Sequence, residues 1–200
     1  MGKTRIPVGI FLFDEVEVLD FAGPFEVFSL AENSADKSKI FQVHTISERP
    51  APVSARNGLK VQAEFRCDNH PQLEMVIVPG GYGAEKIEIH NQPVLSWIRK
   101  QADTCAITAS VCTGAFLLAA SGVLTDQTVT THHLDQADLQ KQYPNLQVIA
   151  GKKFVDTGRI VTSGGISAGI TMSLHLVARI AGREVAAATA RRMEYDWSAD

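Results

Sequence analysis

Residues 106–120, AITASVCTGAFLLAA, decide how this chain is expected to fold. The run Ala106–Ala109 predicts a buried strand, and the apolar run Gly114–Ala120 predicts a helix after a tight turn. A strand that passes directly into a helix is the repeating unit of sheets covered by helices on both faces. A side chain on such a turn is pushed out over the sheet, so Cys112 is expected at a nucleophile elbow.

The same alternation extends outward from this stretch to both ends of the chain. Strands are predicted at residues 8–13, 40–46, 75–78, 129–131 and 159–162, and helices at 24–31, 93–102, 167–180 and 183–195. Two short alternating segments around Asn57 and Gly58 predict a small antiparallel excursion within residues 50–65. Without a repeat or linker, residues 1–200 are expected to form one doubly wound α/β domain with a mostly parallel sheet sandwiched by helices.

Composition excludes several classes of protein. The 200 residues are 45% hydrophobic and 20% charged, an ordinary globular balance. With 19 basic and 22 acidic residues, the net charge of −3 predicts no direct binding of nucleic acid. No stretch reaches the roughly 18 apolar residues of a membrane span, so no membrane partner is expected. Three cysteines without CxxC spacing indicate neither a disulfide framework nor a zinc site, which favours a reducing cytoplasm.

The turn around Cys112 is the first candidate for chemistry. Unpaired N–H groups and the dipole at a helix start favour an anion, so a thiol there is expected to have a lowered pKa and to act as a nucleophile. The alternative is a buried structural cysteine, the commoner fate of a free cysteine. We favour this structural interpretation for Cys67 and Cys105.

Two further strand ends carry candidate residues. Pro79–Gly83 follows the strand at 75–78, and the N–H of Gly81, paired with one at the start of the Cys112 helix, could stabilise negative charge on a substrate. The alternative is a plain left-handed turn. Asp20, between apolar Leu19 and Phe21, would have a raised pKa and could transfer protons. Alternatively, it caps a helix that begins near Gly23.

Two weaker clusters lie later in the chain. His132 and His133 are adjacent, and adjacent side chains on a strand point to opposite faces, so they make a poor metal pair, although one of them could lie near the thiol. The glycine turn at 163–169, which includes Gly165 and Ile166, is expected to shape a pocket wall. His175 is interpreted as structural.

These residues together resemble the DJ-1/PfpI superfamily, flavodoxin-like relatives of class I glutamine amidotransferases. The resemblance extends from Val8 to about Tyr195 and rests on VPGG at 78–81, VCTG at 111–114 and Thr131-His132. Within the superfamily, LDFAGP at 19–24, SVCTG at 110–114 and GGISAG at 164–169 are most similar to the isocyanide hydratase branch.

That resemblance implies a role for each candidate residue. Cys112 would attack the terminal carbon of an isocyanide, and Asp20 would move the protons that convert the thioimidate into an N-substituted formamide. Thr113 would hydrogen-bond to the intermediate or orient the carboxyl. Contacts to the substrate or its developing negative charge would come from a further set of residues: Gly80, Gly81, Thr113, His132, Gly165 and Ile166. The resemblance also implies a homodimer with the site near its interface, and no metal or organic cofactor.

The sequence departs at one position from the proteases of the superfamily, and three alternatives to hydratase activity stay open. Proteases of the superfamily place a histidine directly after the nucleophile, where this chain has Thr113, so protease activity is not expected. The chain also resembles the amidotransferase-like half of AraC-type transcription regulators, a ligand sensor; if Asp200 ends the natural protein, no DNA-binding half follows. A third possibility is redox sensing through oxidation of Cys112. The fourth is another hydrolase, glyoxalase or deglycase activity.

Overall fold

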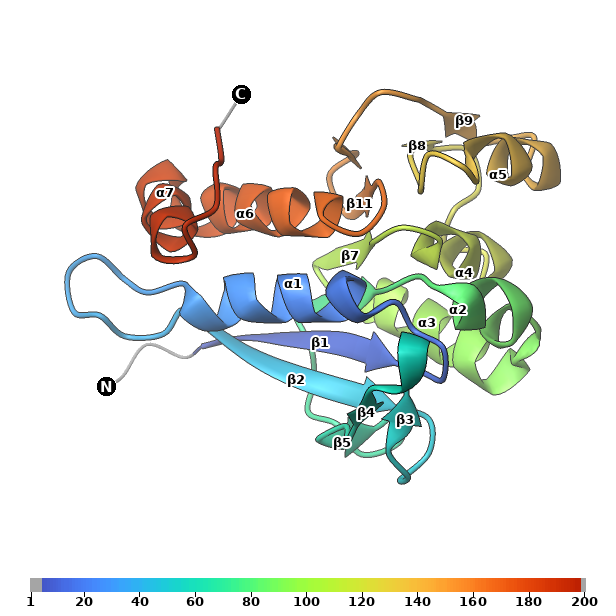
Figure 1. Cartoon of the computed structure of the whole chain (residues 1–200), viewed down its shortest axis with the longest axis horizontal. Coiled ribbons are helices and arrows are strands. Elements are labelled where there is room, and N and C mark those ends of the chain that lie inside the picture. The colour runs from blue at the N-terminus through green and yellow to red at the C-terminus, as the bar shows by residue number, and fades with distance from the viewer. Residues whose placement is uncertain (1–4, 199–200) are drawn as a thin grey trace.

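The computed structural model describes residues 5–198 of the chain, so that Asp200 lies outside the described residues. Its main element is a seven-stranded sheet with the order β10-β11-β7-β6-β1-β2-β5 (Figure 1). The strands are β1 (Ile6–Leu12), β2 (Phe41–Ser47), β5 (Phe65–Arg66), β6 (Met75–Val78), β7 (Ile107–Ser110), β10 (Phe154–Asp156) and β11 (Ile160–Ser163). All neighbouring pairs are parallel except β10 and β11, which are antiparallel.

The order of the five central parallel strands is β2-β1-β6-β7-β11, which is the 2-1-3-4-5 order of flavodoxin-like folds. This confirms the predicted doubly wound α/β class. The direction of winding reverses between β1 and β6, and ligands of such sheets bind beyond the carboxyl ends of the strands at this switch point. Val78 of β6 pairs with Ser110 of β7, so the turns that follow these two strands emerge side by side.

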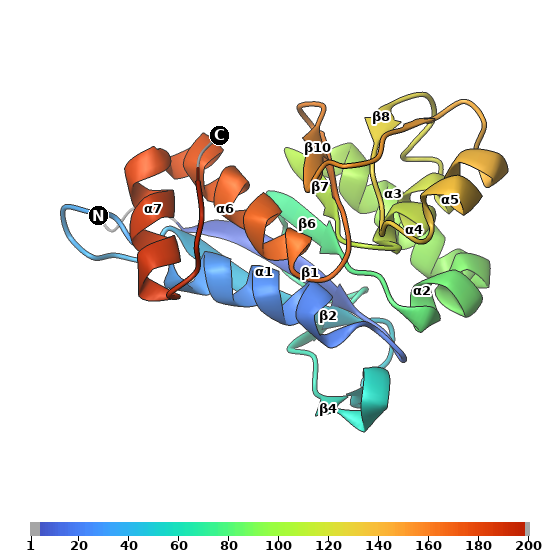
Figure 2. The same ribbon diagram turned by 45° about the horizontal axis from the view of Figure 1, so that its top comes forward.

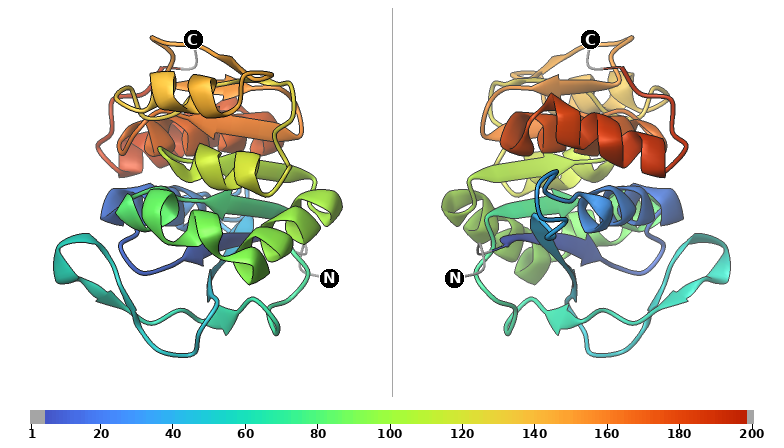
Figure 3. Two further views of the ribbon diagram at one scale, coloured as in Figure 1. Left: turned by 90° about the vertical axis from the view of Figure 1, so that its right-hand side faces the viewer. Right: turned by 90° about the vertical axis from the view of Figure 1, so that its left-hand side faces the viewer.

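Helices cover both faces of the sheet. Figure 3 shows α3 (Gln92–Thr104) and α4 (Gly114–Ala120) in front of one face, and α1 (Val18–Leu30) with α6 (Ala168–Ala181) and α7 (Arg183–Arg192) in front of the other. Figure 2 shows α1 and α6 side by side, and the chain after α7 crosses back over α6. The short helices are α2 (Tyr82–Lys86), α5 (Gln136–Gln142), η1 (Arg56–Gly58) and η2 (Glu88–His90).

The core lies between the sheet and these helices. Ile10, Leu12 and Ile77 on the strands and Leu117 on α4 are fully buried, and each contributes about 1.5–3 kcal/mol by leaving water. Because β1 and β6 are covered on both faces, their sequences are apolar runs instead of alternating ones, whereas the equally buried β7 includes the polar Thr108 and Ser110. Among residues 5–198, no helix combines the length and the apolar character needed to cross a membrane.

The structure confirms one local prediction and corrects two others. The antiparallel excursion is confirmed by β3 (Val53–Ser54) and β4 (Lys60–Val61). The helix predicted from Pro24 begins six residues earlier, at Val18, because Pro24 lies inside the helix and does not open it. The strand predicted at 129–131 is only β8 (Thr128–Val129), which pairs with β9 (Gln147–Val148) in a separate small sheet.

Candidate active site

Cys112 lies on the tight turn between β7 and α4. Its φ of 56° is in the left-handed region, which a non-glycine residue adopts at a cost of about 1–3 kcal/mol. Two hydrogen bonds from distant segments hold this conformation. The Cys112 N–H donates to the Gly164 carbonyl over 3.1 Å, and the Thr131 hydroxyl donates to the Cys112 carbonyl over 2.7 Å. The strain is therefore supported on both sides of the thiol.

Asp20 lies in the first turn of α1 and is completely buried. Its Oδ2 accepts a hydrogen bond of 3.0 Å from the Gly80 N–H, which joins the turn after β6 to the segment after β1. The Cys112 thiol and the Ile166 N–H lie close enough to lower the pKa of this carboxyl. Neither forms a hydrogen bond of standard geometry to Oδ1, which has no such partner within residues 5–198. The carboxyl is therefore only half satisfied and faces the thiol.

The surroundings of Asp20 bring the pKa of its carboxyl group close to neutral pH. Burial raises the pKa of Asp20 to about 7, the Gly80 N–H opposes this shift, and the negative charge of Glu17 adds to it. The position of Asp20 also excludes the capping alternative. The residue before α1 is Glu17, which makes no side-chain cap, and Asp20 itself lies inside the helix.

The expected low pKa of the Cys112 thiol is wrong. Burial raises the pKa of this thiol well above its usual range, and the charge of Asp20 raises it further, while the Thr113 N–H acts in the opposite direction. The thiol is only 7% exposed, and α4 has only seven residues, so desolvation outweighs the dipole of this short helix. The thiol is therefore protonated at rest, with the Asp20 carboxylate beside it as a base.

The glycine turn after β6 contacts the elbow directly. A Cβ on Gly80 would lie 2.6 Å from Thr113 Oγ1, so only glycine permits this approach. The Gly81 N–H donates to Thr113 Oγ1 over 2.9 Å. It is therefore already bonded and is not free to stabilise a substrate anion, which corrects the expectation for Gly81. The Thr113 N–H, which faces the Cys112 thiol, is the backbone donor that the turn presents instead.

The turn before α6 forms another side of the site. Ile166 has φ 51°, an outlier for a β-branched residue, and its side chain is 40% exposed beside Asp20. Gly165 packs against the imidazole of His132, so that a Cβ there would lie 3.1 Å from His132 Nε2. His132 Nδ1 is 2.9 Å from Asp135 Oδ2, which fixes the orientation of the ring. The structure thus brings the predicted Gly165, Ile166 and His132 together.

The reasoning that His132 and His133 point to opposite faces of a strand is wrong. Both lie in a turn, and their ring centroids are 4.5 Å apart. Within residues 5–198 there is no group of three or more His, Cys, Asp or Glu side chains that could hold a metal ion.

Two residues at the site were not singled out from the sequence. They are Glu17, whose charge acts on Asp20, and Asp135, which orients His132. Thr131, noted in the sequence beside His132, holds the Cys112 carbonyl. The spacing of three residues between His132 and Asp135 is a local signal that could have indicated their pairing.

The other two cysteines differ from Cys112 in their surroundings. Burial raises the pKa of Cys67 to about 12 and that of Cys105 to about 11. Cys105 is the buried residue that follows α3, and its thiol donates weakly to the Leu73 carbonyl over 3.5 Å. Carboxylates act on both thiols only through their charge, and within residues 5–198 neither thiol forms a hydrogen bond to a carboxyl group, which agrees with a structural interpretation for both.

Two proteins of known description are similar to this chain in sequence over nearly its whole length. The chain is 31% identical over 191 residues to an isonitrile hydratase of Pseudomonas putida, an alignment that covers 95% of this chain and 78% of the relative. It is 29% identical over 189 residues to the HTH-type transcriptional regulator GbdR of Pseudomonas aeruginosa, covering 94% of this chain and 50% of the regulator. The chain therefore spans about half the length of that regulator.

A solved structure has the same fold. The crystal structure of a ThiJ/PfpI family protein from Pseudomonas syringae superimposes with a TM-score of 0.85 at 20% sequence identity, covering 96% of this chain and 76% of that one. A family model described as the DJ-1/PfpI family matches residues 7–179, which include both turns that carry Asp20 and Cys112. Sequence match, sheet order and elbow thus agree that this chain belongs to the DJ-1/PfpI family.

Proposed function

We propose that this protein hydrates isocyanides, R–N≡C, to N-substituted formamides, with Cys112 as the nucleophile and Asp20 as the group that moves protons. The observation that carries the proposal is the buried Asp20 carboxyl, with a pKa of about 7, facing a thiol on a strained turn. The 31% identity to an isonitrile hydratase supports the substrate class. Thr113 occupies the position after the thiol and supplies no imidazole base, which favours a carboxyl-driven reaction.

The first half of the reaction forms a covalent adduct. The Asp20 carboxylate accepts the thiol proton as Cys112 Sγ forms a bond to the terminal carbon of the isocyanide. The same proton then moves from Asp20 to that carbon, which gives the thioimidate R–N=CH–S-Cys. A carboxyl with a pKa near 7 suits both steps, because at neutral pH both its charged form, which accepts a proton, and its neutral form, which donates one, are populated.

The second half consumes water. Water adds its oxygen to the thioimidate carbon, Asp20 accepts the released proton, and this proton passes to the nitrogen. The C–S bond then breaks, the sulfur regains the proton of the hydroxyl group, and R–NH–CHO leaves. The exposed Ile166 side chain and the His132 ring border the space in which the R group would lie.

The direct test is to incubate the purified protein with an aryl isocyanide and measure formamide formation. Cys112→Ala is expected to abolish turnover, and Asp20→Asn to reduce it by at least about 10²-fold, as expected for the loss of a general acid–base group. Cys67→Ala is the matched control, since it removes a thiol without a carboxyl partner, and it should leave turnover unchanged. No turnover by the folded protein with an intact Cys112 would contradict the proposal for this substrate class.

A second candidate is a ligand-sensing domain, favoured by the similarity to one half of the regulator GbdR. It predicts saturable binding of a small ligand at the elbow without turnover, which calorimetry on the Cys112→Ala variant can measure. Sensing by oxidation is disfavoured, because peroxide attacks thiolates and burial raises the pKa of the Cys112 thiol.

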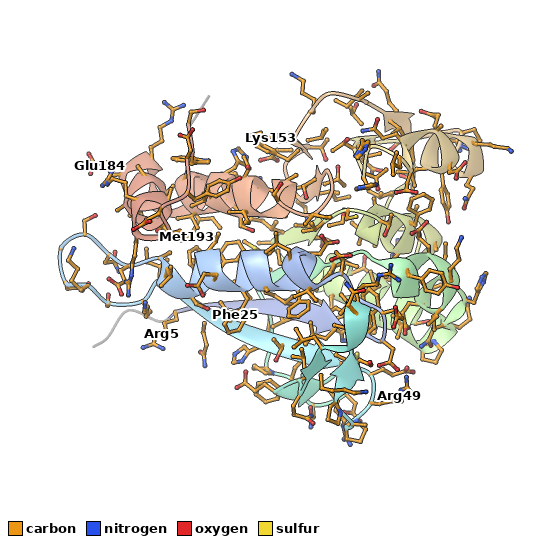
Figure 4. All side chains as sticks on the ribbon, viewed as in Figure 1. Arg5, Phe25, Arg49, Lys153, Glu184 and Met193 are labelled. Carbon is orange, nitrogen blue, oxygen red and sulfur yellow. The ribbon has the colours of Figure 1, made fainter. Side chains whose placement is uncertain are left out.

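We also propose that the protein acts as a homodimer in the cytoplasm. Leu19, next to Asp20 on α1, is 37% exposed, Phe25 on the same helix (Figure 4) is 38% exposed, and Ile166 beside Asp20 is 40% exposed. A second copy would cover these apolar side chains. Light scattering after gel filtration should give twice the monomer mass, and Phe25→Glu should lower it; a monomeric wild-type protein would contradict the proposal.

A further inference from the structure

A cavity lies between α6, the loop that leads into β10 and the chain after α7, and neither Cys112 nor Asp20 lines it. Its volume is about 650 Å³, within the range of roughly 300–1,000 Å³ typical of small-molecule pockets. It is lined by Gly151, Lys152, Lys153, Phe154, Thr171, His175, Asp196, Trp197 and Ser198. Figure 4 labels Lys153 above α6, and Figure 2 shows the segment after α7 crossing that helix.

The charge of this cavity favours an anion. Lys152 and Lys153 line it, against Asp196 as the one acidic lining residue within the described part of the chain. Asp156, directly behind the wall, is already compensated: its Oδ2 is 2.7 Å from His175 Nε2, and Arg179 donates to both of its oxygens over 2.9 Å. Burial would raise the pKa of Asp156, but the hydrogen bonds from His175, Gly158 and Arg179 hold it below its usual value. Asp156 thus adds little negative potential to the cavity.

Aromatic rings supply the rest of the wall. The rings of Phe154 and His175 stack on each other, with centroids 4.4 Å apart and an interplanar angle of 31°, and both residues line the cavity. Trp197 lines the same cavity from the segment after α7. Flat aromatic surfaces favour planar rings, through offset stacking and apolar burial. A ligand that stacks on the aromatic rings and pairs with the lysine side chains is therefore planar and carries a negative charge.

Both walls of the cavity are held in place by hydrogen bonds within the protein. The Lys153 carbonyl accepts a bond of 2.8 Å from the Gly164 N–H, which ties the lysine loop to the end of β11. On the other side, the Tyr195 and Thr171 hydroxyls lie 2.9 Å apart and tie the segment after α7 to α6. A cavity held in shape before binding loses less entropy when a ligand enters.

We propose that this cavity is a binding site for a small aromatic carboxylate, distinct from the site around Cys112. The carboxylate lies against Lys152 and Lys153, and the ring packs against the aromatic side chains of Phe154, His175 and Trp197 that line the cavity. The site does not depend on isocyanide hydration, so it can be tested whatever the reaction at the thiol is.

The probe is 4-fluorobenzoate, titrated into the full chain and followed by ¹⁹F NMR and calorimetry. We expect saturable binding to one site per chain. The double variant Lys152→Ala/Lys153→Ala should bind at least about tenfold more weakly, because charge-assisted hydrogen bonds are lost. Trp197→Ala should also weaken binding through loss of the ring contact. 4-Fluorobenzamide has nearly the same shape without the charge and should bind severalfold more weakly than the acid.

Two control variants test whether the probe binds in this cavity and nowhere else on the protein. Lys60→Ala/Lys100→Ala removes two exposed lysines from outside the cavity and should leave the affinity unchanged. Cys112→Ala should also keep the affinity, which places the ligand away from the thiol. The proposal is overturned if binding is absent at about 10 mM probe. It is equally overturned if the amide binds as tightly as the acid, if the lysine-free cavity retains full affinity, or if Cys112→Ala abolishes binding.

Discussion

Replacing Asp20 by asparagine should stabilise the protein at alkaline pH and leave its stability nearly unchanged in acid. Asparagine has almost the same shape and keeps an oxygen that can accept the Gly80 N–H. It carries no charge at any pH, whereas the wild-type carboxyl becomes charged in a fully buried position. The variant therefore removes the cost of burying that charge and little else.

The magnitude follows from the pKa of Asp20 in the folded and unfolded states. Burial raises this pKa from 3.8 to about 7, so the folded protein binds more protons than the unfolded chain in this interval. Stability consequently falls as pH rises from about 4 to about 7, at 1.36 kcal/mol per pH unit, for a total of about 4 kcal/mol. The advantage of Asp20→Asn should thus grow from about zero near pH 4 to about 4 kcal/mol above pH 8.

Urea denaturation of both proteins at a series of pH values measures this difference. The exposed Asp126→Asn is the matched control, and its difference from wild type should stay constant with pH. If the difference between wild type and Asp20→Asn is also constant to within about 0.5 kcal/mol, the carboxyl is not buried in its charged form, and the reasoning about its proton transfer fails.

Other expectations follow from the same contacts. The kcat/KM for an aryl isocyanide should rise as pH increases through about 7, since the Asp20 carboxylate is the base, and a flat profile around neutral pH would contradict this role. Gly80→Ala should abolish turnover and lower the free energy of unfolding by about 1–3 kcal/mol, measured in urea, because its Cβ would lie 2.6 Å from Thr113 Oγ1. Thr113→Val leaves the partly buried Gly81 N–H without its acceptor and should cost about 1 kcal/mol, whereas Thr113→Ser keeps the hydroxyl; equal melting temperatures of the two variants would refute this.

Much of the fold could be predicted from short-range pattern. The buried strand at β7, the turn at Cys112 and the apolar helix α4 are continuous in sequence, so hydrophobic runs and turn residues sufficed to place them. Prediction failed for residue types that are compatible with more than one kind of local structure. Pro24 was interpreted as a helix start but lies inside α1, and His132 was placed on a strand but lies in a turn.

The identity of the candidate site residues was likewise visible in the sequence, but their electrostatics were not. Local pattern was enough to indicate the α/β class and to place Asp20, Gly80 and Cys112 after the strands β1, β6 and β7. The raised pKa of the Cys112 thiol and the hydrogen bond already made by the Gly81 N–H are properties of the folded chain. Those properties depend on burial and on partners that are 60 residues apart for Asp20 and Gly80, and 32 apart for Gly81 and Thr113. A local pattern carries no information on how completely such distant segments exclude water from one carboxyl and one thiol.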